Sequence, residues 1–239
     1  MTSSRLLLAA TALTALACMG CKETVSSANI RTQGIAMFTE VVATSGTDVI
    51  VTSTLQVGGG NGTYVILDSG DAIYLEVDGE RSRMLAESDG VYEGRSNVGD
   101  EDTEYRVILE RELDDPADDS RGSLPGPFEF TSAFGSAEIS RELDDLEVTW
   151  DPADSGDDME IEFREIGCVV KESIDIGGDS GSYTLAAGEL RSTASSSEKT
   201  CDVEVTMTRT RGGSTDSNLN SDSRFTLIQT RSFTLVSAP

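Results

Sequence analysis

Short runs in which apolar and polar residues alternate recur from residue 33 to the end of the chain, and no sustained helical period interrupts them. Side chains along a β-strand point to opposite faces in turn, so a two-residue period indicates a strand with one buried face. Turns rich in Gly, Asp and Ser separate these runs, and the sequence therefore predicts an all-β fold of sandwich type. The alternating positions are Val49, Val51, Leu55 and Val57; Ile73, Leu75 and Val77; Tyr105, Val107, Leu109 and Arg111; Leu146, Val148 and Trp150; Met159, Ile161 and Phe163; Val203, Val205 and Met207; Phe225 and Leu227; Phe233 and Leu235.

The passage at residues 114–130 (DDPADDSRGSLPGPFEF) indicates a boundary between two units. It is acidic and contains three of the five prolines of the chain, of which Pro125 and Pro127 stiffen the backbone. A chain of 239 residues can form one large or two ordinary domains. We therefore expect two tandem β-sandwich domains, at residues 33–130, ending in this linker, and at residues 131–239.

The beginning of the second unit resembles a known module. The stretch SRELDDLEVTWDPADSGDDMEIEF holds Val148, Trp150 and Pro152 in a Val-x-Trp-x-Pro order. It resembles the opening of a fibronectin type III or immunoglobulin-like module, in which the tryptophan lies in the core. The resemblance covers roughly residues 132–237 and implies a sandwich with Trp150 as a core residue. It does not select a function, because sandwiches host many unrelated activities.

The first residues have the layout of a secretory signal. Arg5 precedes an uncharged run, residues 6–20, which ends in small residues and a cysteine. This run is short and rich in alanine compared with the about 20 strongly apolar residues of a membrane span. It resembles the signal of bacterial lipoproteins, in which the first mature residue is a lipidated cysteine. The resemblance implies a signal peptide at residues 1–20, a polar tether at residues 21–32 and an exported protein anchored to the cell envelope by lipid.

The number of cysteines that remain after cleavage distinguishes two possible lipidation sites. Cleavage before Cys21 leaves Cys168 and Cys201 as an even pair, whereas cleavage before Cys18 also leaves Cys21 as a free thiol. We therefore expect lipid on Cys21, with Cys18 as the alternative, and a disulfide between Cys168 and Cys201. Lys22 follows Cys21. In the well-studied enterobacterial sorting system an aspartate at that place retains lipoproteins in the inner membrane, so we expect the outer membrane.

The composition restricts the chemistry. The formal net charge of −25 opposes binding to nucleic acid. The chain has no histidine, which excludes Ser-His-Asp and Cys-His mechanisms and zinc sites with histidine ligands. GGGNG at residues 58–62 lies between two predicted strands and indicates a hairpin loop rather than a phosphate-binding loop. We infer no catalytic activity; a hydrolase that uses carboxylates alone is the remaining enzymatic alternative.

One loop is a candidate calcium site. Asp216, Asn218, Asn220 and Asp222 occupy alternate positions, the spacing at which oxygen ligands converge in calcium loops. The EF-hand pattern also requires glycine and glutamate where this chain has Ser221 and Leu227. The alternative is a solvated turn, since turns use Asp, Asn and Ser in any case. No other cofactor is expected.

Together these observations predict a lipid-anchored envelope protein with a structural or protein-interaction role. The membrane would be contacted through the anchor, and the further partner would be an unidentified protein or glycan. The alternative is a calcium- or carbohydrate-binding module that uses loops at the end of a sandwich.

Overall fold

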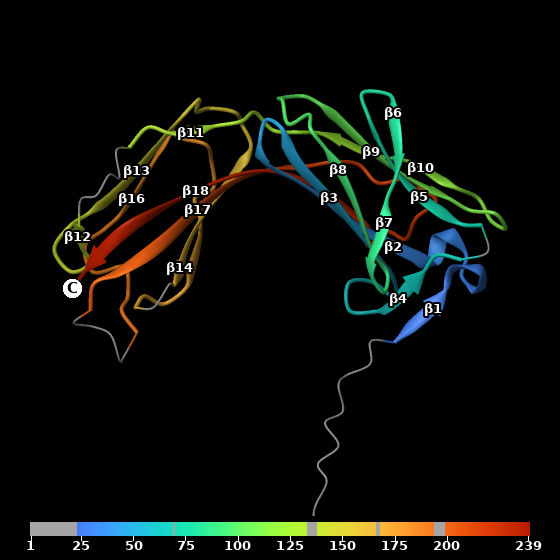
Figure 1. Ribbon diagram of the computed structural model, residues 1–239, viewed down its shortest axis with the longest axis horizontal. Helices are drawn as coiled ribbons and strands as arrows, with labels where there is room; N and C mark the ends of the chain where they lie inside the picture. Colours follow the sequence, from blue (N-terminus) through green and yellow to red (C-terminus); the bar gives the residue numbers. More distant parts are fainter. Residues whose placement is uncertain (1–22, 69, 133–137, 166–167, 194–198) are drawn as a thin grey trace, which may run out of the picture.

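The computed structural model describes residues 23–68, 70–132, 138–165, 168–193 and 199–239. These residues form two β lobes that are joined into an arch (Figure 1). Apart from two 3-10 turns, the regular elements described are all strands, so the predicted all-β fold with two sandwich-like units is confirmed. The predicted signal peptide, with Cys18, and the predicted lipidation site Cys21 lie outside the described residues. Within these residues, no helix has the length and hydrophobicity of a membrane span.

The first lobe packs two sheets against each other around one core. One sheet is antiparallel throughout and the other also contains parallel pairs. The strands of the larger sheet in this lobe are β1 (Thr24–Ser26), β4 (Thr63–Ile66), β3 (Asp48–Val57), β2 (Ile35–Ser45), β8 (Val91–Ser96) and β7 (Leu85–Ser88). The facing sheet consists of β10 (Ala117–Ser123), β9 (Glu104–Glu110), β5 (Ala72–Val77) and β6 (Glu80–Arg83). Between β1 and β2 lie the two 3-10 turns, η1 (Ser27–Asn29) and η2 (Thr32–Gly34).

The second lobe is built around Trp150, which is 3% exposed and belongs to the core of this lobe, as predicted. One layer of this lobe is a three-stranded sheet. The other layer consists of the long final hairpin and the strands that pair with it or lie next to it in the same sheet. The first of these layers contains β11 (Glu129–Phe130), β13 (Leu146–Asp151) and β16 (Ser182–Leu185). The other contains β12 (Glu138–Ser140), β14 (Asp158–Glu165) and β15 (Glu172–Asp175).

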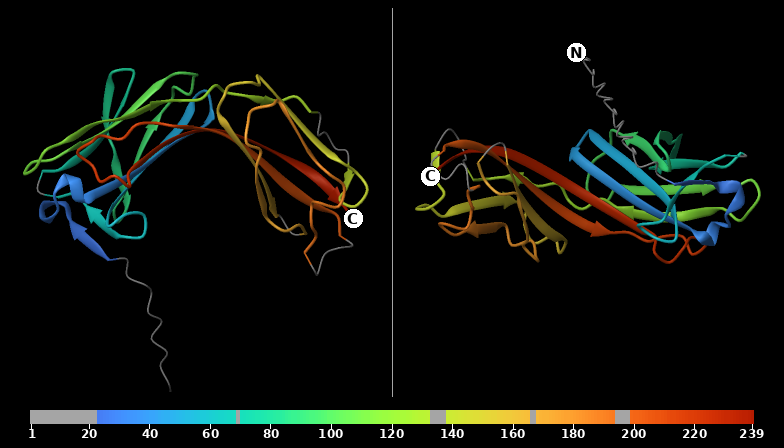
Figure 2. Two further views of the ribbon diagram at one scale, coloured as in Figure 1. Left: turned by 180° about the vertical axis from the view of Figure 1, so that it is seen from behind. Right: turned by 90° about the horizontal axis from the view of Figure 1, so that it is seen from below.

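The two lobes share a sheet through the last hairpin. This hairpin consists of β17 (Cys201–Gly212) and β18 (Arg224–Ala238), which run from one lobe to the other along the inner side of the arch (Figures 1 and 2). The first part of β18 pairs in parallel with β2, and its last residues pair in parallel with β12. Consequently, Leu227 lies in the first core and Leu235 in the second. The division into residues 33–130 and 131–239 stays a prediction; in the structure β18 contributes to both cores.

The strands form where the two-residue period predicts them. In β3, for example, Val49, Val51, Ser53 and Leu55 are fully buried, while Ile50, Thr52 and Thr54 are partly exposed. GGGNG connects β3 to β4, which pair in antiparallel register, so the hairpin loop is confirmed. Within the predicted boundary at residues 114–130, Leu124 packs in the first core and Phe128 packs in the second.

Candidate functional site

The predicted disulfide joins Cys168 to Cys201 across 33 residues of sequence, so this pairing is confirmed. Cys168 lies 1% exposed at the edge of the second core, and Cys201 is the first residue of β17. The bond therefore ties the loop after β14 to the beginning of the shared hairpin. Its role in the structure is to hold the second lobe together.

The candidate calcium loop lies between β17 and β18, and its oxygens accept hydrogen bonds from the backbone. Asp216 Oδ2 accepts from the amides of Asp118 and Asp119, both at 2.8 Å, and its Oδ1 accepts from the amide of Asn218 at 2.8 Å. Asn220 Oδ1 accepts from the amide of Asp222 at 2.9 Å. These contacts fix the loop against β10.

The amide of Asn218 points out of this loop, and its Nδ2 donates to the carbonyl of Pro116 at 2.8 Å. In the part of the chain that the structure describes, no group of three or more His, Cys, Asp or Glu side chains is placed to hold a metal. The calcium site predicted in this loop stays a prediction. Its expected ligands are Asp216, Asn218, Asn220 and Asp222.

A buried ion pair fixes the N-terminal segment to the first lobe. Arg111 Nε donates to Asp71 Oδ2 at 2.8 Å, and the two side chains are only 2% and 3% exposed. The other end of the guanidinium reaches the segment that follows β1: Nη2 donates to the carbonyls of Ser27 and Ile30, both at 2.8 Å, and Nη1 donates to Thr32 Oγ1 at 3.1 Å. We call these five residues the N-terminal clamp.

Asp114 strengthens the clamp from outside. Its Oδ2 accepts from the backbone amide of Thr32 at 2.6 Å and from the hydroxyl of the same residue at 3.2 Å. The hydrogen bond from the Thr32 amide, followed by that from the Asp115 amide, holds the pKa of the Asp114 carboxyl below its ordinary value. Most of the predicted tether is thus folded onto the lobe.

A second buried ion pair lies where the two lobes meet. Arg209 Nη2 and Asp179 Oδ2 are 2.8 Å apart, with side chains 1% and 0% exposed. Trp150 Nε1 donates to Asp179 Oδ1 at 2.6 Å. Arg209 also donates to the carbonyls of Gly126, at 2.7 Å, and Pro152, at 2.6 Å. We call Trp150, Asp179 and Arg209 the junction cluster, because Gly126 belongs to the passage between the lobes.

Arg211 extends this arrangement along β17. It forms a bidentate pair with Asp157, at 2.7 and 3.0 Å, and donates to the carbonyl of Leu124 at 3.1 Å. The hydrogen bonds to Asp157 raise the pKa of the Arg211 guanidinium. Two arginines of one strand therefore hold the inter-lobe passage at Leu124 and Gly126.

The electrostatics of the junction cluster keep Asp179 ionised. Burial alone would raise the pKa of this carboxyl. The hydrogen bonds from Ser155 and Trp150, together with the positive charge of Arg209, outweigh burial and hold the pKa below its ordinary value. A carboxyl that serves as a general acid needs a raised pKa instead. Asp179 is therefore a structural counter-ion.

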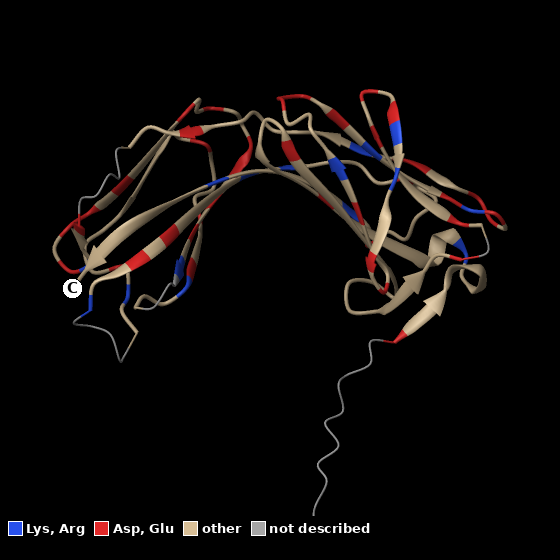
Figure 3. Ribbon diagram, in the orientation of Figure 1, with Lys and Arg blue, Asp and Glu red and all other residues tan. Residues whose placement is uncertain are grey.

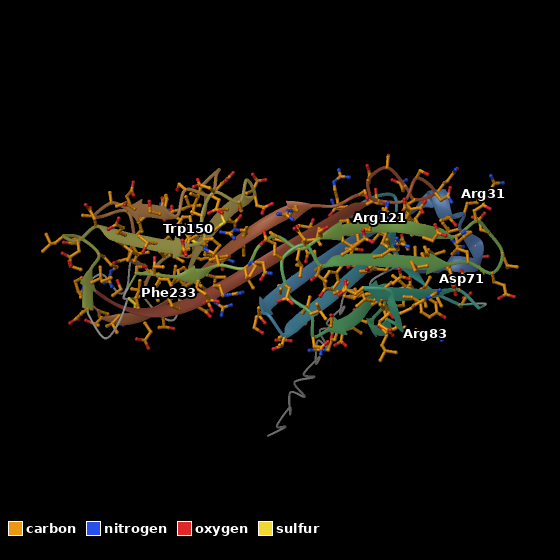
Figure 4. All side chains as sticks on the ribbon, turned by 90° about the horizontal axis from the view of Figure 1, so that it is seen from above. Arg31, Asp71, Arg83, Arg121, Trp150 and Phe233 are labelled. Atoms are coloured by element: carbon orange, nitrogen blue, oxygen red, sulfur yellow. A yellow bond between two sulfur atoms is a disulfide. The ribbon has the colours of Figure 1, made fainter. Side chains whose placement is uncertain are left out.

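A hollow with a volume of about 660 Å³ lies over the outer face of the sheet β10–β9–β5–β6. Figure 4 looks onto this sheet and labels Arg121 on β10 and Arg83 at the other edge. We call the hollow the outer groove. Its lining includes the side chains of Arg81, Arg106, Ile108, Glu110, Asp118 and Asp119.

Guanidinium and carboxylate groups alternate along the outer groove. Arg81 pairs with Glu110 at 2.6 Å, and its guanidinium lies 3.8 Å from the centre of the Tyr74 ring. Arg106 approaches Glu76 at 3.5 Å, and its Nε is buried without a hydrogen-bond partner within the described residues. The groove thus presents donors and acceptors to a polar ligand.

The sequence pattern did not identify the clamp or the junction cluster, although it contained a signal for both. Each arginine occupies the next position on the buried face of an alternating run. Arg111 follows Tyr105, Val107 and Leu109, and Arg209 follows Val203, Val205 and Met207. A charged residue at a buried phase requires a buried partner. The partners, Asp71 and Asp179, lie in turns that carry no periodicity.

Comparison with known proteins gives distant structural similarities only. No family model and no curated protein matches the sequence. A segment of two fibronectin type III domains from chicken tenascin is similar with 12% identity and a TM-score of 0.26, covering 84% of this chain and 97% of that segment. The Yersinia pseudotuberculosis adhesin InvE has 11% identity and a TM-score of 0.25, with coverage of 85% and 58%. At such TM-scores these similarities carry no conclusion about function.

Proposed function

We propose that this chain is a lipid-anchored protein of the bacterial cell envelope, in the outer membrane, with a structural or protein-interaction role and no catalytic activity. The leader at residues 1–20, with its apolar run ending at Cys21, supports export and lipidation. The acyl chains would hold the protein to the membrane, since two or more chains give stable anchoring.

The contacts of the buried carboxylates support the non-catalytic role, and this observation carries the proposal. The buried carboxylates of the described residues are those of Asp71, Asp157, Asp179 and Asp216. The first three pair with arginines, and Asp216 accepts from backbone amides. All four hold loops in place. Carboxylate-only hydrolysis would need one of a pair of carboxyls to carry a raised pKa in a cleft.

Processing of the native protein tests the anchor. In the natural host or a related bacterium, globomycin should cause the unprocessed precursor to accumulate, and the mature protein should enter the detergent phase of Triton X-114. Mass spectrometry should find acylated Cys21 at the amino terminus. The variant Cys21→Ser should lose acylation, whereas the matched variant Cys18→Ser should keep it. A mature protein that stays in the aqueous phase and is insensitive to globomycin would contradict the anchor.

A second candidate function, binding of a carbohydrate, is favoured by the outer groove. Its guanidinium and carboxylate groups offer the paired donors and acceptors that sugar hydroxyls need. Isothermal titration with envelope polysaccharide tests it. Binding that is weakened by Arg106→Met and unaffected by the distant Arg164→Met would support the groove; equal binding by both variants would dismiss it.

A further inference from the structure

The folded part of the chain begins very close to the proposed lipid site. Strand β1 starts at Thr24, three residues after Cys21. A chain spans at most about 3.3–3.6 Å per residue, so the Cα atoms of Cys21 and Thr24 are no more than about 11 Å apart. On the basis of the proposed anchor at Cys21, we infer that the β1–β4 end of the first lobe lies directly against the lipid surface.

Two sets of contacts prevent the tether from lengthening. β1 pairs in parallel with β4, with Thr24 opposite Tyr64 and Ser26 opposite Ile66, and the amide of Tyr64 donates to the carbonyl of Glu23 at 3.0 Å. The N-terminal clamp then holds the segment that follows β1 through the buried guanidinium of Arg111. Releasing the segment would leave the buried guanidinium of Arg111 without its acceptors on Ser27, Ile30 and Thr32, which is costly.

The surface at this end suits a lipid surface. In a chain with a net charge of −25, residues 57–66 (VGGGNGTYVI) carry no charge, and they form the loop and strand next to β1. Figure 3 shows β4 and the loop before it without Lys, Arg, Asp or Glu, with acidic residues beside them at the start of β1 and the end of β7. Ile66 is 37% exposed and Leu85 is 69% exposed, and both line one hollow beside β4. These are apolar groups that a headgroup layer can cover.

Neighbouring acidic residues define which lipid fits. Asp222 lies beside Gly59, and Asp89 precedes Gly90, which packs against Tyr64. Together with the exposed Glu23 before β1, these carboxylates oppose an anionic membrane, so the surface fits zwitterionic lipid. The β5–β6 hairpin lies at the opposite end of the lobe from β1 and β4 in Figure 1, so this arrangement points that hairpin away from the membrane.

Quenching by brominated lipid tests the contact. The acylated full-length protein is placed in phosphatidylcholine vesicles whose acyl chains carry bromine near the headgroup. Asn61→Trp adds a tryptophan to the exposed loop between β3 and β4, and the matched variant Ser82→Trp adds one to exposed β6; the native Trp150 is buried and gives the common background. We expect the bromolipid to quench the added fluorescence of Asn61→Trp and not that of Ser82→Trp.

The outcomes separate the anchor from the contact. Protein that floats with the vesicles while neither variant is quenched overturns the contact alone. Protein that does not float with vesicles overturns the anchor, and the inference with it. A 12-residue Gly-Ser insertion between Lys22 and Glu23 adds a flexible reach of about 20 Å. It should preserve flotation and abolish the quenching of Asn61→Trp; unchanged quenching would overturn the short tether as its cause.

Discussion

The two lobes are sandwiches of the same kind, but they are stabilised differently. The described core of the first lobe contains 21 buried residues, almost all aliphatic or aromatic, and its buried ion pair, Arg111–Asp71, lies at the rim beside the N-terminal segment. The described core of the second contains 15 and is supported by the Cys168–Cys201 disulfide and the Arg209–Asp179 pair. A smaller core buries less apolar surface, so covalent and ionic constraints carry more of its stability.

Replacing Arg209 by methionine should have the largest effect on this comparison. The variant leaves the carboxylate of Asp179 buried without its counter-ion and removes the donors to Gly126 and Pro152. We expect a loss of about 3–5 kcal/mol in the free energy of unfolding. Urea titration followed by the fluorescence of Trp150, the single tryptophan of the chain, measures it in the second lobe.

The double variant Arg209→Met with Asp179→Leu is the matched control. Removing both charges also removes the unpaired carboxylate, so most of the stability should return. Equal instability of the single and double variants would mean that the ion pair is not what distinguishes the second lobe.

Two leucines of β18 test whether the lobes unfold separately. Leu227 is fully buried in the first core, and Leu235 is 1% exposed in the second, on the same strand. Each change to alanine should cost about 2–5 kcal/mol. Hydrogen–deuterium exchange by peptide should show Leu227→Ala raising exchange mainly in β2 and β3, and Leu235→Ala mainly in β14. Identical exchange maps would show that the shared hairpin makes the arch one cooperative unit, and the comparison would lose its basis.

Removing the disulfide should cost the second lobe about 2–4 kcal/mol, as expected for closing a loop of this size. Cys168→Ser with Cys201→Ser should move the urea midpoint of Trp150 fluorescence downward and leave exchange in β3 and β5 unchanged. Reduction of the native protein should reproduce the shift. An equal loss of protection in both lobes would contradict the view that the bond serves the smaller one.

Much of this architecture could be predicted from the sequence, because strand formation depends on local alternation. The positions Val49 to Val57 and Val203 to Met207 lie in strands, the 58–62 loop forms a hairpin, and Trp150 lies in the core. Cysteine parity predicted the disulfide. These features follow from residues within one element, or from a residue type with one available partner.

The remaining features depend on pairings between distant residues. The parallel pairs β1–β4 and β18–β2 join strands about 40 and about 190 residues apart, and no local pattern specifies them. For the same reason the N-terminal segment could not be predicted to fold onto the lobe, because its partners Arg111 and Asp114 come far later in the chain. The calcium ligands and the lipidation at Cys21 stay predictions.

Asp216 offers a smaller test on the first lobe. Asp216→Ala removes the acceptor of three backbone amides, and each net hydrogen bond contributes about 0.5–1.5 kcal/mol. We expect a loss of about 1–3 kcal/mol that is the same with and without millimolar calcium. Differential scanning calorimetry in both conditions measures it. A calcium-dependent rise in Tm that this variant abolishes would instead establish the loop as a metal site.

The smallest expected effect is a difference between the lobes in their response to acid. Both lobes contain a carboxyl whose pKa is lowered in the fold, Asp114 in the first and Asp179 in the second. A lowered pKa stabilises the fold above the unfolded value of about 3.9, and this contribution is lost as the pH falls through the lower folded value. The variants Asp114→Asn and Asp179→Asn should therefore each flatten the decline in stability below about pH 5 in their own lobe.

Salt separates the two carboxyls. Asp114 lies at the surface, where ions screen its interactions, whereas Asp179 is shielded with Arg209 in the junction cluster. Raising the salt concentration to about 1 M should therefore remove much of the effect of Asp114→Asn and leave that of Asp179→Asn. Exchange measured by lobe between pH 3 and 6 gives both profiles. If salt changes the stability of both variants equally, the acid sensitivity of the second lobe does not depend on a buried ion pair, and the contrast between the surface carboxyl of Asp114 and the buried carboxyl of Asp179 fails.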